Sequence, residues 1–206
     1  AAGQDPVTTT DELSPSGETS SYRSNPIKMS EFTLSRRDPE YVGRAKAMQA
    51  MEADRKAGRA NAEMDKMCAA VGLSADELKN TGIGSVVFAV KPGDGSAREQ
   101  AASCQKVLGG WANITQEYAT KRYRGNCVNW GMLPFVMDDA VNSGMAVGDI
   151  IFLPGVRKAL LEDKTDINAV WVHDGVKKEI VLHLPALTSD ERDIIVAGSL
   201  INYNRG

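Results

Sequence analysis

The sequence is poor in the residues that build metal centres and disulfide frameworks. Its 206 residues include only three cysteines and two histidines. Cys68, Cys104 and Cys127 are odd in number and widely spaced, which argues against a disulfide framework and indicates a reducing compartment such as the cytoplasm. No C-x-x-C pair is present, so the chain itself is not expected to bind an iron–sulfur cluster or zinc. Each cysteine is interpreted as a small buried hydrophobic residue.

Long apolar runs and a strong excess of charge are also missing. The apolar runs fall far short of the ~20 residues that cross a membrane. A net charge of −3 gives no reason to expect nucleic acid or an anionic membrane as the partner. Residues 1–6 lack the basic start and apolar core of a signal peptide. A start without methionine suggests an excised piece of a longer chain or a processed product.

The most informative stretch that is present covers residues 91–100, Lys-Pro-Gly-Asp-Gly-Ser-Ala-Arg-Glu-Gln. The apolar run 85–90 precedes it and a helix-like segment, 99–108, follows, which predicts a strand, a glycine-rich turn and a helix. Gly93 and Gly95 let the backbone turn sharply and leave its N–H groups uncovered. The start of the following helix adds unpaired N–H donors and the positive end of the helix dipole.

Two side chains complete this predicted site. Arg98 adds a planar, fork-shaped cation that suits a carboxylate or phosphate. Ser96 would lie at the tip of the loop beside the bound anion. The stretch therefore indicates a carboxylate-binding site with a hydroxyl within reach, although a plain strand-to-helix connection with a surface arginine remains an alternative. A P-loop is excluded because no lysine follows Gly95 at the required spacing, and a nucleophile elbow because the G-x-S-x-G frame is absent.

Five sequence blocks resemble the C-terminal, or swivel, domain of the aconitase family, and they follow one another along the chain in the same order as in the family. Residues 93–102, GDGSAREQAA, are similar to the family's G-x-G-S-S-R-E-x-A-A. The other blocks are LGGWANIT at 108–115, NCVNWGMLPF at 126–135, TTDELSPSG at 9–17, and the closing LTSDE and AGSLINY at 187–191 and 197–203. The resemblance extends from about residue 8 to residue 203.

The resemblance implies an α/β fold in a β/β/α three-layer arrangement, and a hydro-lyase activity on a hydroxy-polycarboxylate. It makes Ser96 the base that removes a C–H proton, and Arg98 and Arg23 the clamps that hold substrate carboxylates. Position 97 also binds substrate in the family through a second serine. Ala97 replaces that serine here, so citrate or isocitrate is not implied as the substrate. Three residues of the same blocks, Asp11, Gly93 and Gly95, would support the site.

Aconitases also need a 4Fe–4S cluster, which three cysteines hold in their large N-terminal portion. The resemblance therefore implies that this chain is half of an active site and inactive alone. Its partners would be a cluster-bearing region, in the same longer chain or in a large subunit, and a di- or tricarboxylate substrate. An alternative function is a non-catalytic carboxylate-binding or interaction module that kept the swivel fold.

The expected organisation has three parts. Residues 1–38 form an extended N-terminal arm that carries Arg23, residues 39–80 form a helical insertion, and residues 81–206 form the α/β swivel core. Within the core, residues 117–123 are predicted to be helical. The apolar runs 169–173 and 179–184 flank Asp174-Gly175, which predicts a hairpin with His173 and His183 in a paired structural role.

Overall fold

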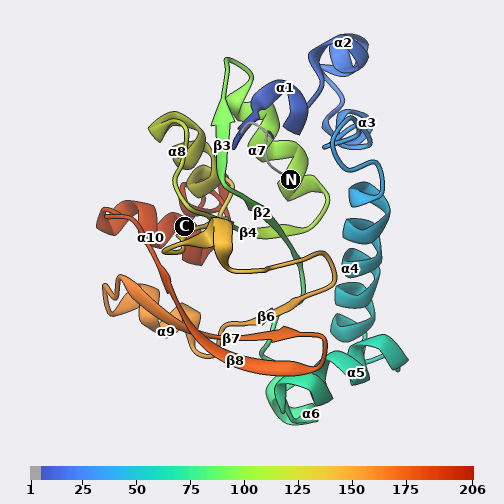
Figure 1. Cartoon of the computed structure of the whole chain (residues 1–206), viewed down its shortest axis with the longest axis vertical. Helices are drawn as coiled ribbons and strands as arrows, with labels where there is room; N and C mark the ends of the chain where they lie inside the picture. The colour runs from blue at the N-terminus through green and yellow to red at the C-terminus, as the bar shows by residue number, and fades with distance from the viewer. Residues whose placement is uncertain (1–5) are drawn as a thin grey trace.

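The computed structural model describes residues 6–206, which form a mixed α/β structure (Figure 1). The strands are β1 (Val7–Thr9), β2 (Ser85–Ala89), β3 (Lys91–Asp94), β4 (Gly110–Thr115), β5 (Leu133–Val136), β6 (Ile150–Phe152), β7 (Asp166–His173) and β8 (Val176–His183). The helices are α1 (Thr10–Leu13), α2 (Ser16–Thr19), α3 (Pro26–Ser30), α4 (Tyr41–Lys56), α5 (Ala62–Val71), α6 (Ala75–Leu78), α7 (Arg98–Val107), α8 (Lys121–Asn129), α9 (Val156–Leu161), α10 (Ser189–Ala197) and α11 (Leu200–Tyr203), with 3₁₀ turns η1 (Ser20–Tyr22) and η2 (Ala140–Asn142). The α/β fold class predicted from the sequence is confirmed.

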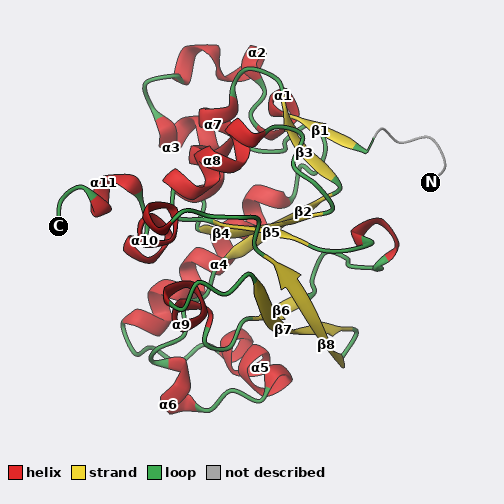
Figure 2. Cartoon of the chain, turned by 90° about the vertical axis from the view of Figure 1, so that its left-hand side faces the viewer, coloured by secondary structure: helices red, strands yellow, loops and turns green. Residues whose placement is uncertain are grey.

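Six strands form one sheet in the order β2-β4-β5-β8-β7-β6. Its first half, β2, β4 and β5, is parallel, and its second half, β8, β7 and β6, is antiparallel. A single residue pair, Val136 and His183, joins the two halves. Outside this sheet, β1 and β3 form a separate parallel pair. Figure 2 shows α7 and α8 above the parallel strands, α10 and α9 to their left, and the β7–β8 hairpin below the parallel half.

Two large apolar clusters lie on either side of the parallel strands. The first cluster packs α1, α4, α7 and α8 together around buried Leu13 and Tyr123. The second lies between the sheet and helices α9 and α10, and it includes Phe135 and Leu182. Burial of these apolar surfaces is the main force that holds the helices on the sheet. No helix within residues 6–206 is both long enough and apolar enough to cross a membrane.

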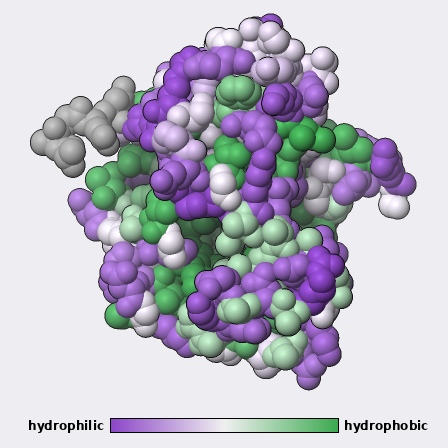
Figure 3. Space-filling view, turned by 90° about the vertical axis from the view of Figure 1, so that its right-hand side faces the viewer, coloured by the Kyte–Doolittle hydropathy of each residue, from purple (hydrophilic) through white to green (hydrophobic). Residues whose placement is uncertain are grey.

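The longest helix, α4, runs along one side of the molecule from α3 to α5 and α6 (Figure 1). Val42, Ala45, Met48 and Met51 recur at helical spacing; Met48 is partly buried and the other three are buried. A smaller third cluster joins Met51 to Met64 and Ile83. The outer surface of this side is mostly hydrophilic, with separate apolar patches (Figure 3).

The segment expected to be an extended arm contains mostly short helices. Residues 1–5 of that segment lie outside the described residues. Only β1 is extended, and α1, α2, η1 and α3 follow it. Thr9 caps α1 because its hydroxyl accepts from the Glu12 N–H, while the Glu12 carboxylate accepts from the Thr9 N–H. This capping box folds the chain back immediately after the strand.

Two local predictions within the core were wrong. Lys91–Asp94, expected to be part of a turn, forms β3, because it pairs with the distant β1. The predicted helix at 117–123 begins only at Lys121, where Thr120 caps it by accepting from the Tyr123 N–H. The preceding residues are not helical, since the N–H groups of both Gln116 and Glu117 donate to the Val90 carbonyl.

The predicted hairpin is present, with Asp174 and Gly175 at positive φ in its turn. A paired role for its two histidines is wrong, because His173 lies opposite Val176 and His183 lies opposite Asp166, at the two ends of the hairpin. Each histidine is instead bonded to carboxylates. His173 Nδ1 lies 2.7 Å from Asp149, and His183 Nδ1 lies 2.8 Å from Asp166.

Candidate active site at the serine loop

The loop that carries Ser96 connects the end of β3 to the start of α7. Its two glycines are required by their surroundings. Gly93 has φ +98°, and a Cβ there would lie 2.3 Å from the Tyr123 ring. Gly95 has φ +121°, and a Cβ there would lie 2.2 Å from the Thr10 Oγ1. Any other residue at either position would combine backbone strain with a steric clash.

This close approach brings two predicted blocks together. The Thr-Thr-Asp block at 9–11 and the Gly-Ser-Ala loop at 95–97 line one cavity of about 200 Å³. The complete lining is Thr9, Thr10, Asp11, Ser16, Asp94, Gly95, Ser96 and Ala97. Of the predicted site residues, Asp11, Gly95, Ser96 and Ala97 therefore share this cavity.

Asp11 is fixed in the cavity by several donors. Its Oδ1 accepts from the Ser16 N–H at 2.8 Å and from the Ser16 hydroxyl at 2.7 Å. Its Oδ2 accepts from Arg36 at 2.6 Å. The side-chain and backbone hydrogen bonds from Ser16, with a further contribution from Arg36, lower the pKa of Asp11 below its ordinary value. Asp11 is therefore a carboxylate at neutral pH.

Arg36 was missed by the sequence interpretation. Besides Asp11, it binds Glu18 through two hydrogen bonds, from Nε to Oε1 at 3.0 Å and from Nη2 to Oε2 at 2.6 Å. These bonds to Glu18, together with the charge of Asp11, raise the pKa of Arg36. No spacing rule marks Arg36 in the sequence, because it reaches Asp11 only after the helices between them have folded back.

The side chains become more buried from Ser96 toward the start of α7. Ser96 is exposed, whereas Ala97 and Arg98 are partly buried. Ala97 makes no side-chain cap for α7, so no side chain covers the first N–H groups of this helix. The Nε atom of Arg98 is buried and has no hydrogen-bond partner among residues 6–206. An unpaired buried donor of this kind is a position where a bound acceptor would be favourable.

Arg23 lies apart from this constellation. It is exposed at the end of η1, and it does not line the cavity. Gly93 and Arg98 flank the loop without lining the cavity. Asp94 lines it, so the cavity contains two carboxylates, from Asp94 and Asp11, beside the exposed hydroxyl of Ser96.

The described residues do not offer a ligand set for a metal cluster. Among residues 6–206 no group of three or more histidine, cysteine, aspartate or glutamate side chains is placed to hold a metal ion. Burial raises the pKa of the Cys104 thiol to about 11 and that of the Cys127 thiol to about 12, which opposes the thiolate form that a cluster needs. Cys104 and Cys127 are buried, as predicted, whereas Cys68 is only partly buried.

Comparison with known proteins agrees with the motifs. No curated protein sequence matches the chain. Among solved structures, 3-isopropylmalate dehydratase (leuD) from Methanocaldococcus jannaschii is similar, with a TM-score of 0.52 and 18% sequence identity over 97% of this chain and 87% of that chain. This likeness shows a common fold. The family model described as aconitase C-terminal domain matches residues 40–140, a range that includes the serine loop and most of the helical segment before it. Residues 40–140 thus match the aconitase C-terminal, or swivel, domain, and the chain as a whole shares its fold with the solved dehydratase.

Proposed function

We propose that this chain is the swivel part of an aconitase-like hydro-lyase, which removes water from a hydroxy-polycarboxylate and adds it back. The observation that supports this most is the convergence of the Thr-Thr-Asp block at 9–11 and the loop at 95–97 on one cavity. The similar solved structure is a dehydratase, which agrees with this class of reaction. The two segments pack directly against each other at Gly95 and Thr10.

In the proposed reaction Ser96 is the base. Loss of water removes a proton from the carbon next to a carboxylate and a hydroxide from the neighbouring carbon, and the electrons of the C–H bond form the new double bond. The Ser96 oxygen, acting as the alkoxide, takes the proton. A serine alkoxide needs positive surroundings, which the uncapped first turn of α7 and the guanidinium of Arg98 would supply.

Arg98 is proposed to hold a substrate carboxylate, and its unpaired buried Nε supports that role. Arg23 is proposed as a second clamp. Since Arg23 is exposed and lies outside the cavity, it would bind a carboxylate that extends beyond the cavity toward the partner. Ala97 removes a hydroxyl donor from the site, so a hydroxy acid other than citrate or isocitrate is the proposed substrate class.

The group that accepts the hydroxide is proposed to lie outside this chain. A 4Fe–4S cluster in a partner region would supply the Lewis acid that takes the hydroxyl, and none of the described residues of this chain is proposed as its ligand. We therefore expect the isolated chain to be inactive, and to act when closed over a cluster-bearing region of the same protein or of a large subunit. The three free thiols agree with action in the reducing cytoplasm. The net charge of −3 gives no reason to propose nucleic acid or an anionic membrane as a partner.

The test is an assay of the complete protein or complex with its cluster in place. Absorbance of the enoate product is followed over a panel of hydroxylated di- and tricarboxylic acids. Ser96→Ala should lower kcat by roughly 10²–10⁴-fold, the usual contribution of a positioned base. Ser24→Ala, an exposed serine outside the cavity, is the matched control and should keep the activity.

Two other outcomes would contradict the proposal, one for the role of Ser96 and one for the function itself. Equal activities of wild type and Ser96→Ala would remove Ser96 as the base. Binding of carboxylic acids without turnover of any of them, in a complex with an intact cluster, would favour the non-catalytic carboxylate-binding module instead.

A further inference from the structure

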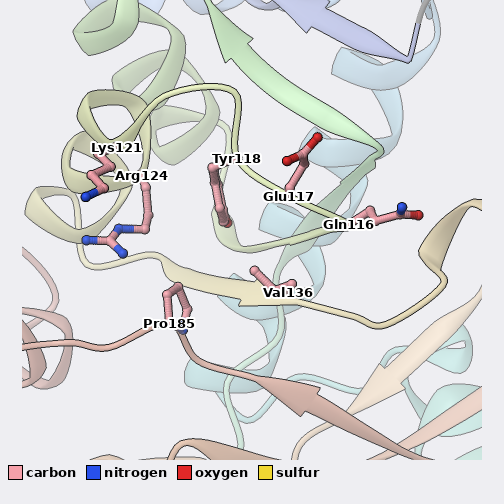
Figure 4. A pocket seen from close by; sticks show the side chains of 7 residues that line it. All are labelled: Gln116, Glu117, Tyr118, Lys121, Arg124, Val136 and Pro185. Carbon is pink, nitrogen blue, oxygen red and sulfur yellow. The ribbon is translucent and has the colours of Figure 1, made fainter.

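A second cavity, of about 210 Å³, lies beside the first turn of α8. It is lined by Gln116, Glu117, Tyr118, Lys121, Arg124, Val136 and Pro185 (Figure 4). Three separate parts of the chain meet here, namely the connection from β4 to α8, the end of β5, and the residue that follows β8 by two positions. We call it the Arg124 cavity.

The charges around the Arg124 cavity are unevenly placed. Lys121 and Arg124 are one helical turn apart on α8, and Figure 4 shows their cationic groups on the same side of the cavity, across from Gln116 and Glu117. Neither cation forms an ion pair within residues 6–206. The carboxylate on the far side, Glu117, is already paired with Lys91 at 2.8 Å. One wall thus carries two cations without an anion.

Two buried polar atoms of this cavity lack partners. The Nε atom of Arg124 and the hydroxyl of Tyr118 are buried, and no group within residues 6–206 forms a normal hydrogen bond with either. Thr115 is near enough to affect the Tyr118 hydroxyl, but no hydrogen bond of normal geometry joins them. Burial raises the pKa of Tyr118 well above its ordinary value, so its hydroxyl is a neutral donor. Buried donors are rarely left unpaired, which indicates a missing acceptor.

We propose that the Arg124 cavity binds a small oxyanion, a carboxylate or a phosphate. Its oxygens would accept hydrogen bonds from the Arg124 guanidinium and the Tyr118 hydroxyl, while Lys121 adds charge at the open side. An acceptor-only ligand satisfies both orphaned donors, whereas a neutral or cationic ligand would leave the two cations uncompensated. This site uses neither Ser96 nor the proposed substrate arginines, and so it does not depend on the proposed hydro-lyase function.

The wall of this cavity also supports the serine loop. The Gln116 and Glu117 N–H groups donate to the Val90 carbonyl, each at 3.1 Å. The Ala119 N–H donates to the Pro92 carbonyl at 3.0 Å, and the Thr120 hydroxyl donates to the Gly93 carbonyl at 3.1 Å. An oxyanion held by Tyr118 and Arg124 would therefore stabilise the backbone that leads into Gly95 and Ser96.

The experiment titrates the full chain with inorganic phosphate and, separately, with malonate, at an ionic strength kept constant with potassium chloride. NMR signals of the arginine Nε–H groups report on the buried atom directly. We expect the Arg124 signal to shift saturably with at least one of the two anions, and the two titrations show whether phosphate or carboxylate is preferred. Chloride alone should give no saturable shift.

Variants test whether the named side chains form the site. Arg124→Gln should weaken anion binding by about 10-fold or more, the loss expected for a charge-assisted hydrogen bond. Lys121→Gln, a change at an exposed position, should weaken it less and leave the fold intact. Arg122→Gln, an exposed change on the same helix outside the cavity, should bind like wild type. Absence of a saturable shift with both anions, or equal affinities of Lys121→Gln, Arg124→Gln and wild type, would overturn the proposal.

Discussion

The hydroxyl oxygen of Thr10 occupies the space that a side chain at Gly95 would need. A Cβ built on Gly95 would lie 2.2 Å from Thr10 Oγ1, and the φ of Gly95, +121°, is one that other residues rarely adopt. The packing of a helix start in the N-terminal segment against the serine loop thus depends on the absence of a side chain at residue 95. This contact is what brings Asp11 and Ser96 to the same cavity.

Replacing Gly95 should therefore damage both stability and the site. Gly95→Ala is expected to lower the free energy of unfolding by about 1–3 kcal/mol, because backbone strain adds to the clash with Thr10. Gly125→Ala is the matched control, since that helical glycine has no neighbouring atom within 4 Å of a built Cβ. The control should be neutral or stabilising by up to ~1 kcal/mol. Urea denaturation of both variants measures the difference, and an equal effect of the two changes would contradict the packing described here.

Arg36 should contribute to the low pKa of Asp11, but less than Ser16 does. Hydrogen bonds from Ser16 are the largest cause of the lowered pKa, so Arg36→Gln should raise the pKa of Asp11 without returning it fully to its ordinary value. Arg37→Gln, which removes the partner of Glu12, should leave the pKa of Asp11 nearly unchanged. Carboxyl ¹³C titration by NMR measures both. A larger rise in Arg37→Gln than in Arg36→Gln would refute this assignment.

His183 lies where the two halves of the sheet meet, and its contribution to stability should decrease as pH rises. The hydrogen bond to Asp166, with the charges of Asp138 and Asp166 adding, raises the pKa of His183 above 6.5. A raised pKa in the folded state means that the stabilisation is fully present below about pH 6.5 and is lost as pH increases through the higher folded value. His183→Gln should therefore lower Tm most at acidic pH.

Thermal unfolding of wild type and His183→Gln is measured from about pH 5.5 to about pH 8.5, which is roughly the range in which histidine titrates. The difference in Tm should shrink toward the alkaline end. Asp166→Asn provides a second check, because it should lower the pKa of His183 measured by NMR. A difference that widens with pH would show that the sign is wrong.

The ion pair between Glu52 and Arg55 on α4 should stabilise the protein more than the exposed pair between Glu63 and Lys66 on α5. Both side chains are nearly buried, and Glu52 also accepts from the Ile83 N–H at 2.9 Å. Burial by itself would raise the pKa of Glu52, but the hydrogen bonds from Arg55 and Ile83 outweigh it and lower that pKa. Glu52→Ala should cost about 2 kcal/mol, since it leaves the Ile83 N–H unpaired and the nearly buried Arg55 with carbonyl acceptors but no carboxylate.

Glu63, paired with Lys66 in solvent, supplies the comparison. Both side chains of this pair are about 70% exposed, at 69% for Glu63 and 73% for Lys66. Glu63→Ala should change the free energy of unfolding by ~0.5 kcal/mol or less. Chemical denaturation of the two variants would count against this ranking if Glu63→Ala were the more damaging.

Local sequence determined those features whose causes are local. The helix α4 was predictable from the spacing of Val42, Ala45 and Met51, because an apolar stripe at helical period must face a core. The capping box at Thr188 and Glu191 was predictable because both partners lie within one turn. The motifs around Ser96 also indicated a resemblance to the aconitase C-terminal domain, which the match over residues 40–140 confirms.

Tertiary structure decided whatever depends on segments that are distant in sequence. Lys91–Asp94 became a strand only because β1 lies beside it. Arg36 reached Asp11, and Thr10 reached Gly95, only once the N-terminal helices had folded against α7. The Arg124 cavity could not be predicted from Lys121 and Arg124 alone, because Val136 of β5 and Pro185 after β8 complete its lining. Local sequence patterns predict the secondary structure of a residue and the face on which its side chain lies. A cavity depends on which distant segments pack together, and local patterns do not contain that information.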